Sequence, residues 1–134
     1  MKKRILIWLL SPFLFGCVDG EEILIEPNYS IEGKWLWSPS ENRSDANTMY
    51  EFVNGLRYTY YCITCPADDA YWNSLDITDA LPSTHPYTFE NDTLKVDLHF
   101  GNESVALVTF ECDGGKLFMD GKFSHFWRLT SDCN

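Results

Sequence analysis

The chain has 134 residues, and its 20 acidic side chains outnumber its 10 basic ones, so the formal net charge is −10 at pH 7. This length is typical of a single domain. A nucleic-acid-binding face needs a concentration of cations that so acidic a chain does not supply, and attraction to an anionic membrane surface is disfavoured for the same reason.

The first residues have the layout of a secretory signal peptide rather than of a transmembrane helix. A basic head at residues 2–4 precedes an apolar run at residues 5–15, which is too short to span a bilayer. The run ends in Leu14-Phe15-Gly16-Cys17, which resembles the lipobox of bacterial lipoproteins. This resemblance implies that residues 1–16 are removed and that Cys17 carries acyl chains such as palmitate, which anchor the protein to a membrane. The alternative is ordinary secretion with no role for Cys17.

Residues 17–29 are expected to form a lipid-anchored linker, punctuated by Pro27 and Asn28. Its acidic beginning at residues 18–22 resembles the export tags of surface lipoproteins in some gut-dwelling Gram-negative bacteria. We therefore expect a lipid-anchored protein of a Gram-negative outer membrane. It would face the cell surface or, if the acidic stretch is only a tether, the periplasm.

Residues 30–134 are predicted to form an all-β domain, an eight-stranded antiparallel up-and-down β-barrel. Short aromatic and β-branched runs alternate with turn residues, and no long segment shows helical periodicity. A closed barrel removes the exposed edges of an open sheet. The predicted strands are 31–38, 48–53, 56–62, 86–90, 93–100, 104–112, 116–120 and 124–130, with one helical turn near 69–75.

The connections predict two different ends for this barrel. In a meander every second connection lies at the same end, which places the two long connections, 39–47 and 63–85, together. The tight turns at Asn54-Gly55, Asn91-Asp92 and residues 113–115 fall at the opposite end. One end is therefore looped and the other tightly closed.

Gly33-Lys34-Trp35 on the first predicted strand and Arg128 on the last resemble the lipocalin superfamily and its small bacterial lipocalin-like lipoproteins. The resemblance implies that Trp35 plugs the closed end of the barrel and that Arg128 packs across it. A large indole is a suitable apolar plug, and a guanidinium over its face gains cation–π attraction.

Apart from Cys17, the chain holds four cysteines, an even number that suggests two disulfides in an exported domain. A disulfide needs Cα atoms within about 7 Å of each other. Because Cys112 and Cys133 are expected at the closed end, and Cys62 and Cys65 at the looped end, we predict the pairs Cys112–Cys133 and Cys62–Cys65. A redox role for Cys62 and Cys65 is disfavoured, because no βαβ pattern surrounds them.

No metal, cofactor or enzymatic activity is expected from the remaining residues. The chain shows no second cysteine pair at zinc-site spacing, and Asp68-Asp69 lacks the spacing of a calcium loop. The three histidines are scattered singly, and no nucleophile or phosphate-loop motif is present.

The aromatic residues leave two functions open for a monomeric domain. The candidates for inward-pointing side chains are Tyr50, Phe52, Tyr58, Tyr60, Phe89, Phe110 and Trp127. They would either line a pocket for a small hydrophobic ligand, in or at the mouth of the barrel, or fill the barrel completely. A filled barrel would be an interaction module that binds a protein or glycan, or inhibits an enzyme, through the connections 39–47 and 63–85. If exposed, Tyr71 and Trp72 would form a contact patch or a lid.

Overall fold

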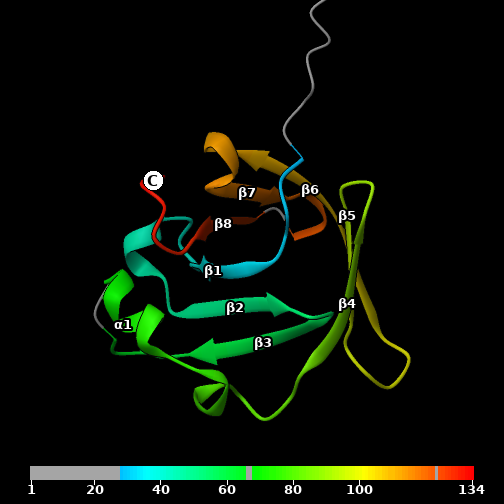
Figure 1. The fold of residues 1–134 in the computed structure, drawn as a ribbon, viewed down its shortest axis with the longest axis horizontal. Coiled ribbons are helices and arrows are strands. Elements are labelled where there is room, and N and C mark those ends of the chain that lie inside the picture. Colours follow the sequence, from blue (N-terminus) through cyan, green and yellow to red (C-terminus); the bar gives the residue numbers. More distant parts are fainter. Residues whose placement is uncertain (1–27, 66–67, 123) are drawn as a thin grey trace, which may run out of the picture.

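The computed structural model describes residues 28–65, 68–122 and 124–134, and it shows one closed barrel of eight antiparallel strands (Figure 1). The strands are β1 (Gly33–Trp37), β2 (Thr48–Val53), β3 (Leu56–Tyr61), β4 (His85–Glu90), β5 (Thr93–Asp97), β6 (Glu103–Glu111), β7 (Lys116–Met119) and β8 (Ser124–Arg128). Each strand pairs with the next in sequence, and β8 pairs with β1. The predicted all-β class, strand number and strand order are confirmed. The predicted signal peptide at 1–16, Cys17 and most of the linker at 17–29 lie outside the described residues.

β5 is shorter than the strand predicted there. It ends at Asp97, whose Oδ1 accepts a hydrogen bond from the His99 amide at 2.7 Å. His99 and Phe100 then adopt φ values of +69° and +54°, which turn the chain, and the Phe100 side chain is fully exposed. Along this strand, the inward side chains Leu94 and Val96 are buried, and the alternation of buried and exposed side chains stops before Phe100.

Helical structure is confined to short segments. α1 (Asp69–Ser74) lies where the sequence predicts a helical turn, and Asp68 caps it by accepting hydrogen bonds from the amides of Ala70 and Tyr71. The 3₁₀ turns are η1 (Arg43–Asp45), η2 (Ile77–Asp79), η3 (Cys112–Gly114) and η4 (Asp120–Lys122). None of the helices in the described ranges is long and apolar enough to cross a membrane.

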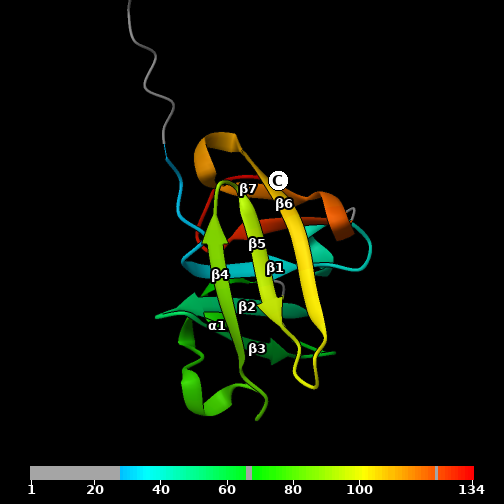
Figure 2. The same ribbon diagram turned by 90° about the vertical axis from the view of Figure 1, so that its right-hand side faces the viewer.

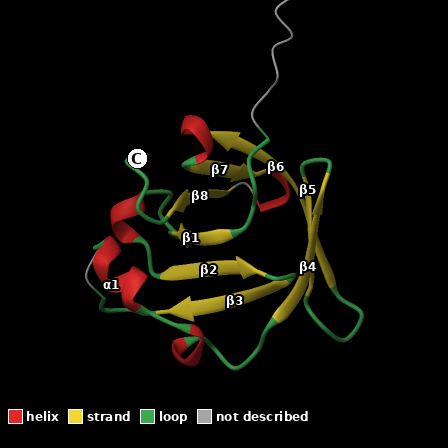
Figure 3. Cartoon of the chain, in the orientation of Figure 1, coloured by secondary structure: helices red, strands yellow, loops and turns green. Residues whose placement is uncertain are grey.

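Two apolar clusters lie on opposite faces of the strands. Because neighbouring side chains alternate between faces, Trp35 points into the barrel while Leu36 points out. The interior cluster is formed by Ile31, Trp35, Phe52, Leu94, Val96, Ala106, Val108, Leu117, Met119 and Phe126. The outer cluster is formed by Leu36, Met49, Tyr60, Trp72 and Leu129. Trp72 belongs to α1, which lies beside the ends of β2 and β3 (Figure 3).

The barrel is joined least extensively between β3 and β4. In the part of the chain that the structure describes, these strands pair at two positions, Leu56 with Pro86 and Arg57 with His85. Farther along β3, the backbone amide of Leu81 donates a hydrogen bond to the strand at 2.8 Å, so the long connection takes the place of β4. Figure 2 shows β4 and β5 crossing β1, β2 and β3 at a steep angle. The barrel therefore closes through a short β3–β4 seam.

Trp35 closes the base of the barrel. Its side chain is fully buried, and its indole Nε1 donates a hydrogen bond to the carbonyl oxygen of Ile31 at 2.7 Å. The guanidinium carbon of Arg128 lies 4.2 Å from the centroid of the Trp35 ring, within the range of cation–π attraction. This is the arrangement that the lipocalin resemblance implies.

Arg128 also joins β8 to two other segments of backbone, residues 30–32 and the turn at Gly114. Its Nε donates a hydrogen bond to Gly114 O at 3.0 Å, its Nη1 to Glu32 O at 2.9 Å and its Nη2 to Ser30 O at 2.7 Å. Gly33 has a φ of +117°, and a Cβ at this position would lie 2.9 Å from Arg128 Nη1. The glycine of the motif is therefore required both by the backbone conformation and by the close approach of the arginine.

The two predicted disulfides are confirmed. Their Cα atoms are 6.3 Å apart in Cys112–Cys133 and 5.7 Å apart in Cys62–Cys65. Cys112–Cys133 spans 21 positions at the closed end, beside the turn whose carbonyl Arg128 binds. A loop of that length contributes about 3 kcal/mol on the chain-entropy model, whereas the short Cys62–Cys65 loop mainly restrains the start of the long connection.

We expect Trp35→Ala to lower the free energy of unfolding by about 3–5 kcal/mol, because it removes a fully buried indole and leaves a cavity. Urea denaturation followed by circular dichroism measures the change. Phe100→Ala, which truncates a fully exposed ring, serves as the control. It should stay within about 0.5 kcal/mol of the unsubstituted protein. A Trp35→Ala protein with the stability of the unsubstituted protein would contradict the plug role.

Candidate functional site

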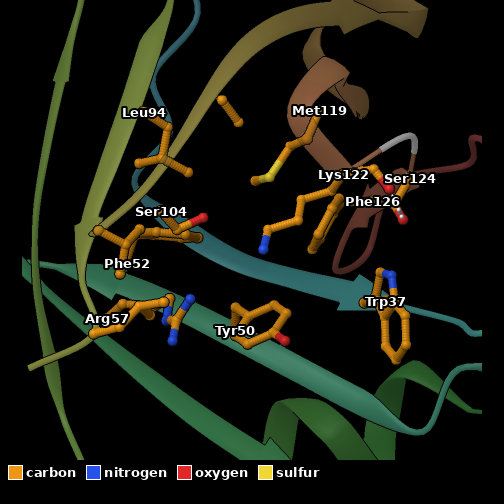
Figure 4. A pocket seen from close by; sticks show the side chains of 13 residues that line it. Trp37, Tyr50, Phe52, Arg57, Leu94, Ser104, Met119, Lys122, Ser124 and Phe126 are labelled. Carbon is orange, nitrogen blue, oxygen red and sulfur yellow. Dashed lines mark hydrogen bonds between the residues drawn. The ribbon is translucent and has the colours of Figure 1, made fainter. Parts of the chain in front are cut away.

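A cavity of about 430 Å³ lies inside the barrel, at the end away from the Trp35 plug (Figure 4). Its lining includes the last residue of β1, Trp37, the last residue of β7, Met119, and the first residue of β8, Ser124. These positions place the cavity at the end for which the sequence predicts the long connections. Pockets for small molecules have volumes of about 300–1,000 Å³, so this cavity is of a suitable size.

Most of the cavity wall is apolar. Phe52 of β2, Leu94 and Val96 of β5, Ala106 of β6 and Phe126 of β8 all line it, and each is nearly inaccessible to solvent. The antiparallel register places Leu94 opposite Ala106, so both side chains face the same side of the sheet. Strands β2, β5, β6 and β8 therefore all contribute apolar side chains to the cavity wall.

Arg57 brings a positive charge into this apolar space. The hairpin register pairs Arg57 with Phe52, which places both side chains on the inner face. Its guanidinium carbon lies 4.9 Å from the centroid of the Tyr50 ring. Burial lowers the pKa of Arg57 from its ordinary value, although an arginine stays protonated at neutral pH. Within the described segments, its Nε is buried and has no hydrogen-bond partner.

Further polar groups surround the same space. Lys122, Ser104 and Ser124 line the cavity, and Tyr50 contributes a phenolic hydroxyl. Figure 4 shows the Lys122 amine and the Arg57 guanidinium pointing into the cavity from different sides. The site therefore combines an apolar wall with a group of hydrogen-bond donors.

Four of the seven aromatic residues considered as lining residues lie on the inner side of the barrel. Tyr50 and Phe52 line the cavity. Phe89 and Phe110 instead pack against the interior cluster, and the Phe110 ring centroid lies 6.2 Å from that of Trp35. These two side chains contribute to the sealed base rather than to the cavity wall.

The prediction that Tyr58, Tyr60 and Trp127 also point inward is wrong. Since Arg57 faces inward, the alternation of β3 sends Tyr58 and Tyr60 outward, where they join the outer cluster. Trp127 pairs with Leu36 of that cluster and faces outward as well. The outer faces of these strands also carry aromatic side chains, which lie in or beside the outer cluster, so an aromatic residue there does not identify the inner face.

The outer cluster contains one strong polar contact. The Tyr60 hydroxyl donates a hydrogen bond to Glu51 Oε2 at 2.5 Å. Burial, followed by the hydrogen bond to Glu51, raises the pKa of Tyr60 above its ordinary value. Tyr60 therefore stays neutral, and its hydroxyl donates the hydrogen bond that links β3 to Glu51 of β2.

Both long connections are tied to the outside of the barrel. Glu41 of the first connection lies with its Oε2 2.6 Å from His125 Nδ1 on β8. Arg43 of the first connection forms an ion pair with Asp69 of the second at 2.7 Å. Trp72 of the second connection is only 1% exposed and packs in the outer cluster against the barrel, so it is not part of an exposed patch or lid.

Sequence reasoning missed Arg57, Lys122 and Ser104. A signal was present for Arg57, because Asn54-Gly55 is typical of a two-residue hairpin turn, which pairs Phe52 with Arg57. The positions of Lys122 and Ser104 beside strand ends depend on boundaries that sequence patterns do not define to the residue.

Comparisons with protein-family models, with curated proteins and with solved structures each found no match. The eight-stranded closed barrel is compatible with a lipocalin-like fold. In residues 28–65, 68–122 and 124–134, no group of three or more His, Cys, Asp or Glu side chains is placed to hold a metal ion.

We expect Arg128→Met and Arg57→Met to differ in their effects on stability. Arg128→Met should lower the free energy of unfolding by about 2–4 kcal/mol, because three backbone carbonyls lose charge-assisted hydrogen bonds. Arg57→Met should change it by less than about 1 kcal/mol, because losing the Tyr50 contact is offset by removing a buried donor that lacks a partner. Urea denaturation of both variants measures the difference, and equal losses would show that Arg57 is a structural group like Arg128.

Proposed function

We propose that this domain is a binding protein for a small hydrophobic ligand, which it holds inside the barrel. The observation that carries the proposal is the cavity of about 430 Å³, walled by buried apolar side chains. Trp35 fills the base, so the ligand enters and leaves at the other end. Removal of apolar ligand surface from water supplies the binding free energy.

The polar lining favours binding over catalysis. Among the described residues that surround the cavity, the polar groups are two cations, Arg57 and Lys122, together with hydroxyl groups and the Trp37 indole. These groups orient a ligand, but they do not provide the pair of nucleophile and base that covalent catalysis uses. We therefore propose a non-enzymatic role.

An interaction module that acts through 39–47 and 63–85 receives less support. That function depends on a filled interior and on exposed contact groups in the two connections. The interior holds a cavity, both connections are tied to the barrel, and Trp72 is buried, although Ile63, Ile77 and Leu81 of the second connection are exposed. Ligand binding inside the barrel agrees better with these observations.

We also propose that the domain is a membrane-anchored lipoprotein, with Cys17 as the acylated residue. The support is the lipobox-like Leu14-Phe15-Gly16-Cys17 behind a basic head and an apolar run. Two or more acyl chains on one residue anchor a protein stably, whereas one chain alone does not. The outer membrane of a Gram-negative bacterium is the location that this proposal implies.

Ala106→Phe tests the ligand site, because Ala106 is buried in the cavity wall and a phenyl ring there occupies the ligand's space. Titration with the neutral fluorescent probe N-phenylnaphthylamine should give saturable binding to the unsubstituted protein. Binding to Ala106→Phe should be at least about tenfold weaker, a loss of about 1.4 kcal/mol.

Val105→Phe is the matched control, since Val105 is the preceding residue of β6 and is half exposed on the outer face. It should bind the probe as the unsubstituted protein does. Melting curves of both variants establish that they are folded. Absence of probe binding to the unsubstituted protein, or equal binding by both variants, would overturn the proposed function.

Cys17→Ala should prevent lipid attachment in cells of a Gram-negative host. Metabolic labelling with an alkyne analogue of palmitate should mark the unsubstituted protein in the membrane fraction, whereas the variant should carry no label and leave that fraction. Cys65→Ala, which removes a different cysteine, should still be labelled. Labelling that persists in Cys17→Ala would contradict the proposed anchor.

A further inference from the structure

Arg57 and Arg128 occupy similar surroundings but differ in what their guanidinium groups bind. Both are partly buried, and each lies over an aromatic ring, 4.9 Å and 4.2 Å from its centroid. Arg128 donates through all three of its nitrogens to backbone carbonyls. Arg57 Nε, in contrast, is buried and has no partner in the described ranges. Arg128 therefore stabilises the fold through its hydrogen bonds, whereas the Nε–H of Arg57 is free to donate a hydrogen bond to a ligand.

A partly buried guanidinium that lacks a counter-ion is less favourable in the empty barrel than one in water. Burial lowers the pKa of Arg57, because partial removal of the guanidinium from water disfavours its charged form. The ion pairs found between described residues join Arg43 with Asp69, and His125 with Glu41 and Glu111. None of these carboxylates is paired with Arg57, so an anion supplied from outside the chain would remove the penalty.

We propose that the ligand of this barrel is an amphiphile with a carboxylate head group, which Arg57 binds while the apolar tail lies against Phe52 and Leu94. This inference rests on the proposed function and specifies the class of ligand. The Nε–H and the adjacent Nη–H of a guanidinium form an edge that binds both oxygens of a carboxylate in parallel. The unpartnered Nε of Arg57 belongs to that edge.

The charges around the cavity support an acidic head group. Lys122 points into the same space, and Tyr50 and Ser104 add hydroxyl donors (Figure 4). No Asp or Glu is among the described residues that line the cavity, so a carboxylate there meets donors alone. A cationic ligand would instead meet two like charges. The cavity is thus positive inside a chain whose net charge is −10.

A matched pair of ligands tests the proposal on the unsubstituted protein. Dodecanoate and dodecanol have tails of the same length and differ in the head group, and each is used to displace N-phenylnaphthylamine. Dodecanoate should bind at least about tenfold more tightly than dodecanol, equivalent to about 1.4 kcal/mol. Affinities within about threefold of each other would overturn the carboxylate proposal and leave ligand binding intact. If the probe, the acid and the alcohol all fail to bind, the proposed function is overturned together with this inference.

Arg57→Met should remove the preference, bringing dodecanoate to within about threefold of dodecanol. Lys95→Met, which removes an exposed cation from the outer side of β5, should keep the full preference. Arg57→Lys retains the charge but loses the two-pronged edge, so an intermediate preference is expected. It also serves as the test if Arg57→Met does not fold. A full preference in either Arg57 variant would overturn the assignment to Arg57.

Discussion

The stacking of Arg128 on Trp35 is the contact on which the shape of this barrel depends. One guanidinium covers the indole that fills the base and binds carbonyls on the approach to β1 and in the turn before β7. Because β1 and β8 are the first and last strands, the same contact closes the cylinder and seals its floor. Gly33 leaves the room that the arginine needs. With the floor sealed, the apolar space that remains lies toward the opposite end.

Strands β1 and β2, which lie near this contact, carry apolar side chains on both faces. The inner and outer faces pack in different clusters. The inner face of β1, β2 and β8 supports the plug and the cavity, while the outer face is covered by α1 and the second long connection. Trp72 fills the outer cluster and the Arg43–Asp69 ion pair holds the first connection against it. The outer cluster thereby adds a second apolar core beside the larger interior cluster, so the buried apolar surface of the domain does not lie only in the interior, where the cavity remains.

The sequence predicts the architecture of this protein better than its site. Turn residues and short apolar runs located all eight strands, and the parity of the turns placed both disulfides, because these features are local or follow from connection order. The phase of β3 and β8 could not be read from alternation, since Tyr58, Tyr60 and Trp127 put large aromatic side chains on the outer faces of these strands. Hence Tyr58, Tyr60 and Trp127 were assigned to the wrong face. Arg57 was missed because a charged residue is an unusual occupant of an inner face, although the Asn54-Gly55 turn implies its position.

The wall of the barrel is held together less extensively at the β3–β4 seam than at the other strand pairs. Neighbouring strands elsewhere in the described chain are joined at three or more positions, whereas this seam has two. One of those two positions is Arg57, so a residue with a buried donor that lacks a partner among the described residues lies at the seam with the fewest paired positions. If the proposed ligand were larger than the cavity, the barrel wall would be expected to open first at this seam, while the Trp35–Arg128 contact kept the floor closed.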